Sequence, residues 1–262
     1  MEIAREAGAL AKGYFDRRVP FELKGEFDLV TEADRNSEKL IVSRLRERLP
    51  SHDIVGEEGG GHLTGSEYRW YVDPVDGTTN FAHGFPVWAV SMGLERAGEM
   101  VAGVIYDPTR DEIFAAERGG GATLNGSPIR VSRAARLDDA LVATGFPSRK
   151  RHANVNIHFY YELAMRTHGV RRAGAAAIDL AYVASGRLDA FWEFGLNSWD
   201  MAAGLLIVEE AGGAISDMRG GRATLDGPHL LTDNGVVHEE ILALFAEIFS
   251  GKFVHSLPQL SR

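Results

Sequence analysis

Hydrophobic residues recur at helical spacing in two segments near the start of the chain. The first covers residues 3–15 and predicts a helix. The second follows residues 31–34, where a threonine and an acidic residue three positions later predict a capping box, and it ends at Pro50. Between the two helices, the polar and glycine-bearing residues 24–28 predict a mobile loop.

Short apolar runs separated by turn residues come next. They cover residues 54–56, 68–72, 87–95, 100–106, 112–117 and 123–131. Asn125-Gly126 is the clearest turn among them, because this pair favours the positive φ angles of a two-residue hairpin. The succession after residue 87 predicts an antiparallel meander.

Strand-like and helix-like segments alternate in the second half of the chain. Strands are expected at residues 140–144, 188–193, 214–217 and 230–232, and helices at residues 153–166, 176–185, 201–211 and 239–249. Such alternation implies helices packed in layers on sheets. Since no repeat or long linker interrupts the pattern, we expect one domain over residues 1–262. A soft boundary near Arg136 would separate its meander half from its α/β half.

Charge and composition narrow the classes of function. The chain of 262 residues has 28 basic and 37 acidic residues and a net charge of −9, which argues against non-specific nucleic-acid binding and is compatible with carboxylates gathered around cations. Cysteine is absent, which excludes disulfides, thiolate zinc sites and a cysteine nucleophile. No apolar run reaches membrane-spanning length and the first residues lack an apolar signal core, so we expect a cytoplasmic location without membrane association.

The residues at 70–81 are the most particular stretch of the sequence. An apolar strand is expected to stop at Asp73-Pro74, and Asp76 follows three residues after Asp73. Two carboxylates on one tight turn repel each other unless a cation or a proton neutralises them. The pair has the hard oxygen ligands that suit Mg²⁺ or Ca²⁺. Gly77 and Thr78 then add backbone N–H groups and a hydroxyl to the same turn.

Other acidic residues have both a structural and a chemical interpretation from their local sequence. Asp34 caps the second helix, Glu57 lies in a glycine-rich loop, Asp200 lies at a helix start and Glu193 lies at a strand end. Each of these placements is common for a carboxylate without any catalytic role. The small residues 202–204 after Asp200 predict that another backbone or a ligand packs closely against that helix.

Several separated motifs nevertheless resemble one family. They are Trp-Tyr-Val-Asp-Pro-Val-Asp-Gly-Thr-Thr-Asn-Phe at residues 70–81, Gly-Glu-Glu at 56–58 and Trp-Asp-Met-Ala-Ala-Gly at 199–204, with further likeness at 28–34 and 174–177. Together they resemble the inositol monophosphatase family, which belongs with fructose-1,6-bisphosphatase to the Mg²⁺-dependent, Li⁺-sensitive sugar-phosphatase superfamily. The resemblance implies an α+β fold, the layered αβαβα sandwich of the sugar phosphatases.

The resemblance also implies a set of metal ligands. Glu57, Asp73 and the backbone carbonyl of Val75 match one site. Asp73, Asp76 and Asp200 match a second site, with Asp73 bridging the two. Glu57 would also share a third, weaker ion with water. The implied cofactor is therefore two or three Mg²⁺ ions, with Mn²⁺ as an alternative.

Further residues match the catalytic and substrate positions of the family. Asp34 and Thr78 match the pair that orients and deprotonates the attacking water, and Glu57 completes the catalytic set through its metal. Gly77 and Thr78 offer backbone N–H groups to the phosphate. Glu193 and the backbone of Ala176 match positions that bind sugar hydroxyls.

One departure from the family pattern concerns the polyol. Ala175 stands where the family often has serine or threonine, so a hydroxyl is missing beside the expected substrate position. The metal ligands are not touched by this change.

The sequence thus predicts a phosphomonoesterase of a small polyol phosphate, above all inositol 1-phosphate, that works by direct attack of a metal-activated water. A phosphoaspartate route would usually show Asp-x-Asp at a strand end, whereas here the spacing is Asp-x-x-Asp. The alternatives are the same chemistry on fructose 1,6-bisphosphate, histidinol phosphate or a 3′-phosphonucleotide, and a non-catalytic interaction protein that keeps the fold. The family's habit implies a homodimer.

Overall fold

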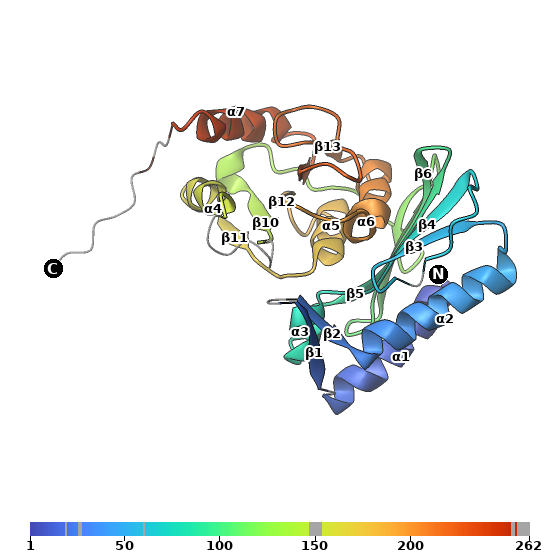
Figure 1. Cartoon of the computed structure of the whole chain (residues 1–262). Helices are drawn as coiled ribbons and strands as arrows, with labels where there is room; N and C mark the ends of the chain where they lie inside the picture. The colour runs from blue at the N-terminus through green and yellow to red at the C-terminus, as the bar shows by residue number, and fades with distance from the viewer. Residues whose placement is uncertain (19, 26–27, 60, 147–153, 253–254, 256–262) are drawn as a thin grey trace.

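The computed structural model describes residues 1–18, 20–25, 28–59, 61–146, 154–252 and 255. Helices and sheets alternate as layers across the molecule (Figure 1). Helices α1 (Glu2–Arg17) and α2 (Glu32–Arg48) cover the outer face of a seven-stranded sheet, and α5 (Ala176–Ala184) and α6 (Ser198–Glu210) fill the space between it and a five-stranded sheet. Helices α4 (Asn156–Ala164) and α7 (His238–Phe249) pack on the outer face of the second sheet. The expected αβαβα sandwich is confirmed.

The seven-stranded sheet contains the antiparallel meander predicted after residue 87, and all its strands are adjacent in space in their order along the chain. Its strands are β3 (Asp53–Gly56), β4 (Tyr68–Asp76), β5 (Ala89–Arg96), β6 (Glu99–Asp107), β7 (Glu112–Glu117), β8 (Gly121–Leu124) and β9 (Ser127–Pro128). Only β3 and β4 are parallel, and every later pair is antiparallel. The predicted Asn125-Gly126 hairpin joins β8 to β9, with both residues at positive φ.

Strand β4 is longer than predicted. We expected it to stop at Asp73-Pro74, but it continues to Asp76, with a shift in its register against β5 between Asp73 and Asp76. A proline lacks the N–H that a regular ladder needs, and such an irregularity is where a strand tolerates it. Both aspartates lie in the last four residues of β4.

The predicted mobile loop at residues 24–28 is wrong for the residues that the structure describes. Residues 24 and 25 belong to β1 (Phe21–Gly25) and residue 28 to β2 (Asp28–Thr31), and the two strands pair antiparallel. Residues 26–27 lie outside the described part of the chain. The polar composition was misleading because a two-stranded ribbon needs no apolar face of its own.

The five-stranded sheet mixes directions. Its order is β11 (Gly169–Arg171), β10 (Leu141–Thr144), β12 (Ala190–Phe194), β14 (His229–Asp233) and β13 (Ala214–Ser216). Strand β10 is parallel to both of its neighbours, whereas β14 is antiparallel to both of its own. The sequence did not predict β11, which has three residues and so carries no readable alternation.

Helix α6 packs unusually close to the first sheet. A Cβ on Gly93 of β5 would approach the Cβ of Ala202 to 2.8 Å, and one on Gly103 of β6 would approach the carbonyl oxygen of Ala203 to 2.6 Å. The small residues of α6 therefore face a backbone, as one of the two predicted alternatives required. This close approach brings the first turn of α6 beside the end of β4.

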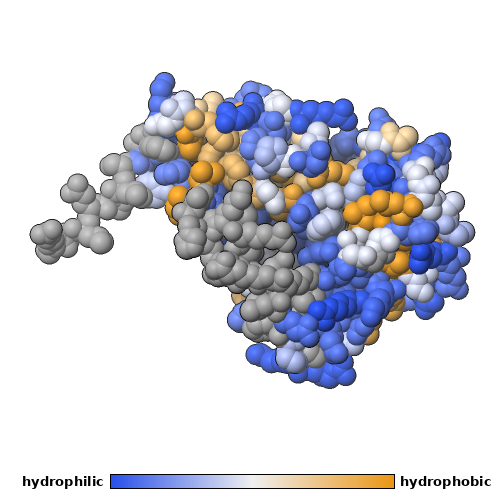
Figure 2. All heavy atoms as spheres, in the orientation of Figure 1, coloured by the Kyte–Doolittle hydropathy of each residue, from blue (hydrophilic) through white to orange (hydrophobic). Residues whose placement is uncertain are grey.

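The outer surface is mixed in polarity. On the face shown in Figure 2, hydrophilic residues predominate and hydrophobic side chains occupy smaller areas between them. Within the described residues, no helix is both long and apolar enough to cross a membrane.

Candidate active site

Asp34 serves the capping box and the candidate site at the same time. Its side chain is fully buried, and Oδ2 accepts hydrogen bonds from the backbone N–H of Thr31 (2.8 Å) and from the Thr31 hydroxyl. Its other oxygen, Oδ1, lies 3.2 Å from Thr78 Oγ1, which also lies 3.1 Å from the carbonyl oxygen of Val75. Burial raises the pKa of Asp34. The structural and the chemical interpretation of this residue are therefore compatible.

Asp73 lies at the centre of a group of acidic side chains. It is 2% exposed, and its Oδ1 accepts the backbone N–H of Val75 at 3.0 Å. Burial raises the pKa of Asp73 well above its usual range, and the charges of Glu57, Asp76 and Asp200 raise it further. The structure thus brings together the carboxylates that the sequence assigned to the metal sites.

Asp76 caps a helix that begins far away in the sequence. Its Oδ1 accepts the N–H of Ala176 (3.2 Å) and its Oδ2 accepts that of Ala177 (2.8 Å). The N-cap residue of α5 is Ala175, which has no side-chain oxygen, so the carboxylate from β4 takes the place of a local cap. The pKa of Asp76 is raised to about 7, first by burial and then by the charge of Asp200, against the effect of these hydrogen bonds.

Asp200 lies in the first turn of α6, which begins at Ser198 rather than at the predicted residue 201. Its Oδ2 accepts hydrogen bonds from the backbone N–H (2.7 Å) and the side-chain amide (3.2 Å) of Asn197, as in a capping box. Burial raises the pKa of Asp200 to about 6, although the Asn197 hydrogen bonds oppose the rise. Like Asp34, Asp200 caps a helix and also lies near the other acidic side chains.

Glu57 is held beside β4 by its backbone. Its N–H donates to the carbonyl oxygen of Val72 (3.2 Å), which extends the parallel pairing of β3 and β4 by one residue beyond Gly56. The buried carboxylate of Glu38 then accepts the N–H of Glu58 at 2.8 Å and fixes the start of the following loop. Glu57 is therefore placed next to Asp73 across the two strand ends.

These side chains match the chemistry of a hard divalent cation. All the donors are oxygens, and burial raises the pKa values of Asp73, Asp76 and Asp200, so that their ionised forms are disfavoured without a bound cation. In the described part of the chain, no three acidic or histidine side chains already stand in the arrangement of a complete metal site. A bound cation would relieve the repulsion among the acidic side chains.

Gly77 is required both by its conformation and by its surroundings. Its φ is 91°, in the left-handed region, and a Cβ would lie 3.0 Å from the carbonyl oxygen of Val87 and 3.1 Å from the Cβ of Ala175. The short helix α3 (Thr78–Ala82) starts immediately afterwards. The turn therefore brings the backbone of Gly77 and Thr78 next to the start of α5.

Glu193 is half-buried and lies within electrostatic range of the acidic group. It lies in β12, and burial raises its pKa well above its usual range. The charges of Asp179, Asp200 and Asp76 raise this pKa further, whereas that of Arg172 lowers it. Its local sequence also allowed an exposed carboxylate at a strand end, and the structure does not place Glu193 in such a position.

Asp179 is a buried carboxylate that sequence reasoning missed. It is 1% exposed on α5, and its Oδ1 has no hydrogen-bond partner within the described residues. Burial raises the pKa of Asp179 well above its usual range, with a further rise from Asp76 and an opposing effect of Arg172. The signal was present in the sequence, since an acidic residue stands between Ile178 and Leu180 in an otherwise apolar helix.

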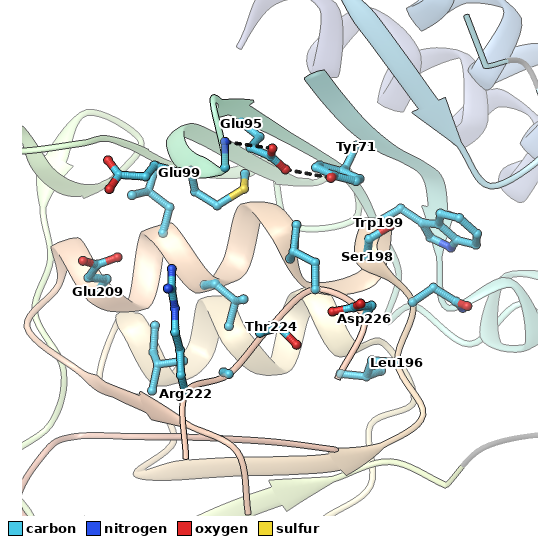
Figure 3. A pocket seen from close by; sticks show the side chains of 18 of the residues that line it. Tyr71, Glu95, Glu99, Leu196, Ser198, Trp199, Glu209, Arg222, Thr224 and Asp226 are labelled. Atoms are coloured by element: carbon cyan, nitrogen blue, oxygen red, sulfur yellow. Dashed lines mark hydrogen bonds between the residues drawn. The ribbon is translucent and has the colours of Figure 1, made fainter. Parts of the chain in front are cut away.

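A groove of about 1050 Å³ lies elsewhere, along α6 (Figure 3). In it, Glu95 accepts hydrogen bonds from the Tyr71 hydroxyl (2.7 Å) and the Gly98 N–H (3.1 Å). Ser198 and Trp199 line the groove, but Asp200, Asp73, Asp76, Glu57 and Glu193 do not. It is therefore separate from the acidic group.

The sequence is similar to those of known proteins. A model of the inositol monophosphatase family matches residues 1–250. A Pseudomonas aeruginosa protein named Nus factor SuhB is 47% identical over 242 residues, which is 89% of each chain. An inositol-1-monophosphatase of Mesorhizobium japonicum is 44% identical over 247 residues, which is 92% of each chain.

Solved structures extend the likeness to three dimensions. The inositol monophosphatase from Anabaena (Nostoc) sp. superposes with a TM-score of 0.86 at 39% identity, and the match covers 94% of this chain and 93% of that one. A full-length family match, relatives above 40% identity and the shared layered fold all point the same way. The chain belongs to the inositol monophosphatase family.

Proposed function

We propose that the protein is a Mg²⁺-dependent phosphomonoesterase that hydrolyses a small polyol phosphate, with inositol 1-phosphate as the first candidate. The observation that carries the proposal is the meeting of Glu57, Asp73, Asp76 and Asp200 at the ends of β3 and β4 and the start of α6. Each of the three aspartates has a raised pKa, and burial is the main cause. The chain belongs to the inositol monophosphatase family, and cation binding for phosphate hydrolysis would account for this acidic group.

The assignment of the metal ligands follows the resemblance to the family, and the oxygen donors are compatible with it. Glu57, Asp73 and the Val75 carbonyl would hold one cation, and Asp73, Asp76 and Asp200 would hold a second. Two divalent cations supply charge neutralisation for a phosphate and acidify a coordinated water. Mn²⁺ offers similar chemistry to Mg²⁺ with these oxygen ligands.

Asp34 and Thr78 would accept the proton that the attacking water loses. Thr78 Oγ1 accepts that proton while its own passes toward Asp34 Oδ1, which lies 3.2 Å away. The raised pKa of Asp34 makes it a stronger base than an exposed aspartate. The backbone N–H groups of Gly77 and Thr78 would orient the phosphate oxygens.

Substrate selection would depend on Glu193 and the start of α5. The Glu193 carboxylate accepts hydrogen bonds from substrate hydroxyls, beside the backbone of Ala176. Ala175 contributes no hydroxyl beside the expected substrate position. The alternative substrates, fructose 1,6-bisphosphate, histidinol phosphate and a 3′-phosphonucleotide, are therefore tested together with inositol 1-phosphate.

A second candidate function follows from the name of one relative. The Pseudomonas aeruginosa protein, 47% identical over 242 residues, is named a Nus factor. That name favours a role as such a factor, alone or beside the phosphatase. The retained carboxylates favour the enzyme, since a pure interaction protein has no need of a charge-repelling group. The proposal also includes a homodimer and a cytoplasmic location, on the resemblance to the family.

A panel of phosphate monoesters tests the proposal. Inositol 1-phosphate, the three alternatives and p-nitrophenyl phosphate are each incubated with the purified protein, with Mg²⁺ or with a chelator. We expect Mg²⁺-dependent phosphate release, fastest from inositol 1-phosphate. Release from none of them would contradict the enzyme and favour the Nus factor role.

A further inference from the structure

The carboxyl group of Glu193 rests directly on Gly145. A Cβ built on Gly145, just after β10, would overlap Cδ and both oxygens of the Glu193 carboxyl group. The φ of Gly145 is not in the positive range, so its backbone would accept any residue. Any side chain here would therefore displace the Glu193 carboxylate from its position, and glycine leaves that space free.

A buried hydrogen-bond network holds this pair of residues in place. Asn156, at the start of α4, donates from Nδ2 to the Gly145 carbonyl oxygen (2.7 Å) and to Thr144 Oγ1 (2.8 Å). Its Oδ1 accepts the indole N–H of Trp192 at 2.6 Å. Thr144 Oγ1 in turn donates to the Trp192 carbonyl oxygen at 2.6 Å. The network thus joins the end of β10 to the residue directly before Glu193.

The network is complete and uncharged. Thr144, Asn156 and Trp192 are each 0% exposed. Both amide protons of Asn156 and its oxygen have partners, and a fully satisfied buried network is rigid. Asp179, Asp200 and Asp76 already raise the pKa of Glu193 by their negative charge. A neutral network adds no further charge that would repel its carboxylate.

We propose that Gly145 and the network of Thr144, Asn156 and Trp192 are positioning residues that aim the Glu193 carboxylate at the hydroxyls of a polyol phosphate. The inference rests on the proposed function. Repulsion from the neighbouring carboxylates pushes Glu193 away from the acidic group. The Gly145 surface and the fixed backbone of Trp192 keep it in place. Gly145 and the network thereby determine the preference of the enzyme for substrates that carry hydroxyls, although they do not contact the substrate themselves.

The first test is Gly145→Ala, compared on two substrates. The added methyl group displaces the Glu193 carboxylate, so kcat/KM for inositol 1-phosphate should fall about tenfold or more, mainly through KM. Hydrolysis of p-nitrophenyl phosphate, which has no polyol hydroxyls, should stay within about twofold of wild type. Gly13→Ala is the matched control, because a Cβ there meets nothing within 4 Å. It should change neither substrate.

A double variant separates positioning from a general structural effect. With Glu193→Ala in place, the methyl group of Gly145→Ala has no carboxylate to displace, so adding it should cost no further activity on inositol 1-phosphate. Thr144→Val, which removes the hydroxyl, should lower the polyol preference, and Thr144→Ser should restore it.

The outcomes distinguish this inference from the proposed function. If Glu193→Gln is selectively impaired on inositol 1-phosphate but Gly145→Ala and Thr144→Val match wild type on both substrates, positioning is overturned and the function stands. Equal losses on both substrates, or additive losses in the double variant, also overturn it. Absence of turnover in the wild type overturns the proposed function, and this inference with it.

Discussion

Thr78 Oγ1 lies 3.2 Å from Asp34 Oδ1, while the other oxygen of Asp34 is held by Thr31. The carboxylate of Asp34 therefore caps the start of α2 and also accepts a hydrogen bond from the hydroxyl of Thr78, just after the end of β4. The arrangement connects the position of a helix to the position of a candidate proton acceptor. A shift of α2 against β4 would break this link without removing any residue of the site.

The first prediction tests this link. Thr78→Val keeps the shape of the side chain but removes the hydroxyl, so kcat should fall about a hundredfold or more, the usual range for a lost acid–base group. Thr78→Ser keeps the hydroxyl and should stay within about tenfold of wild type. Both are measured by steady-state phosphate release at saturating Mg²⁺. Equal activity of the two variants would remove Thr78 from proton transfer.

The second prediction concerns the bridging role of Asp73. Asp73→Asn should lower kcat about a thousandfold or more, because stabilisation by the cations amounts to several kcal/mol. Asp200→Asn should act in the same direction through the second cation. Circular dichroism should show an intact fold in both variants. Near-wild-type turnover of either one at saturating Mg²⁺ would contradict the two-cation assignment.

The third prediction is a pH dependence of stability without metal. The folded-state pKa is about 7 for Asp76 and about 6 for Asp200, both above their ordinary value of 3.8. A raised carboxylate pKa stabilises the fold below the unfolded value, and this contribution is lost as pH rises through the folded value. The Tm of the chelated protein should therefore fall by several degrees between about pH 4 and 7.

Added Mg²⁺ provides the contrast for this measurement. Cations bind the ionised carboxylates, so the rise in Tm that Mg²⁺ causes should grow over the same pH range. Asp76→Asn has no group to titrate at that position and should flatten the pH dependence of the chelated protein. A Tm that increases steadily with pH under chelation would contradict the direction of these pKa shifts.

The fourth prediction concerns lithium. Li⁺ should inhibit at millimolar concentration by replacing the cation held by Asp73, Asp76 and Asp200. Inhibition should be uncompetitive or mixed with respect to the substrate, because the ion enters beside the departing phosphate. Initial rates at several substrate concentrations measure this. Indifference to millimolar Li⁺ would show that the second site differs from the family pattern.

The sequence predicted most elements because their apolar periods were long enough to read. Helices α2 and α7 and the hairpin at Asn125-Gly126 agree closely with their patterns. Strand β11 and the β1–β2 ribbon were not predicted. The first is too short for a period, and the second consists of two short strands, FELKG and DLVT, in which polar and apolar residues are mixed.

The site was harder to derive from local sequence, because its partners are far apart in the chain. The hydrogen bonds of Asp76 to Ala176 and Ala177 span about a hundred residues, and no local rule predicts that β4 caps α5. Asp179 left a local signal, an acidic residue in an apolar helix, but its nearness to Asp76, like the contacts of Asn156 with Thr144 and Trp192, had none. Their positions depend on which strands lie side by side, which only the folded sheets determine.

The last prediction tests whether Glu193 selects the substrate. Glu193→Gln keeps the shape of the side chain and removes its charge. Each charge-assisted hydrogen bond to a substrate hydroxyl is worth about 1.5–3 kcal/mol, so kcat/KM for inositol 1-phosphate should fall about tenfold or more.

The same substitution should leave p-nitrophenyl phosphate almost unaffected, because that substrate offers no polyol hydroxyl. Arg172 lies within electrostatic range of Glu193 and gives a matched control for a general change of charge. Arg172→Gln also changes the local charge by one unit, in the opposite direction, and leaves the carboxylate in place, so it should not reproduce the selective loss. Steady-state kinetics on both substrates decides between the roles. Equal losses for Glu193→Gln would mean that the residue supports the metal ligands or the fold, and no loss on either would remove it from the site.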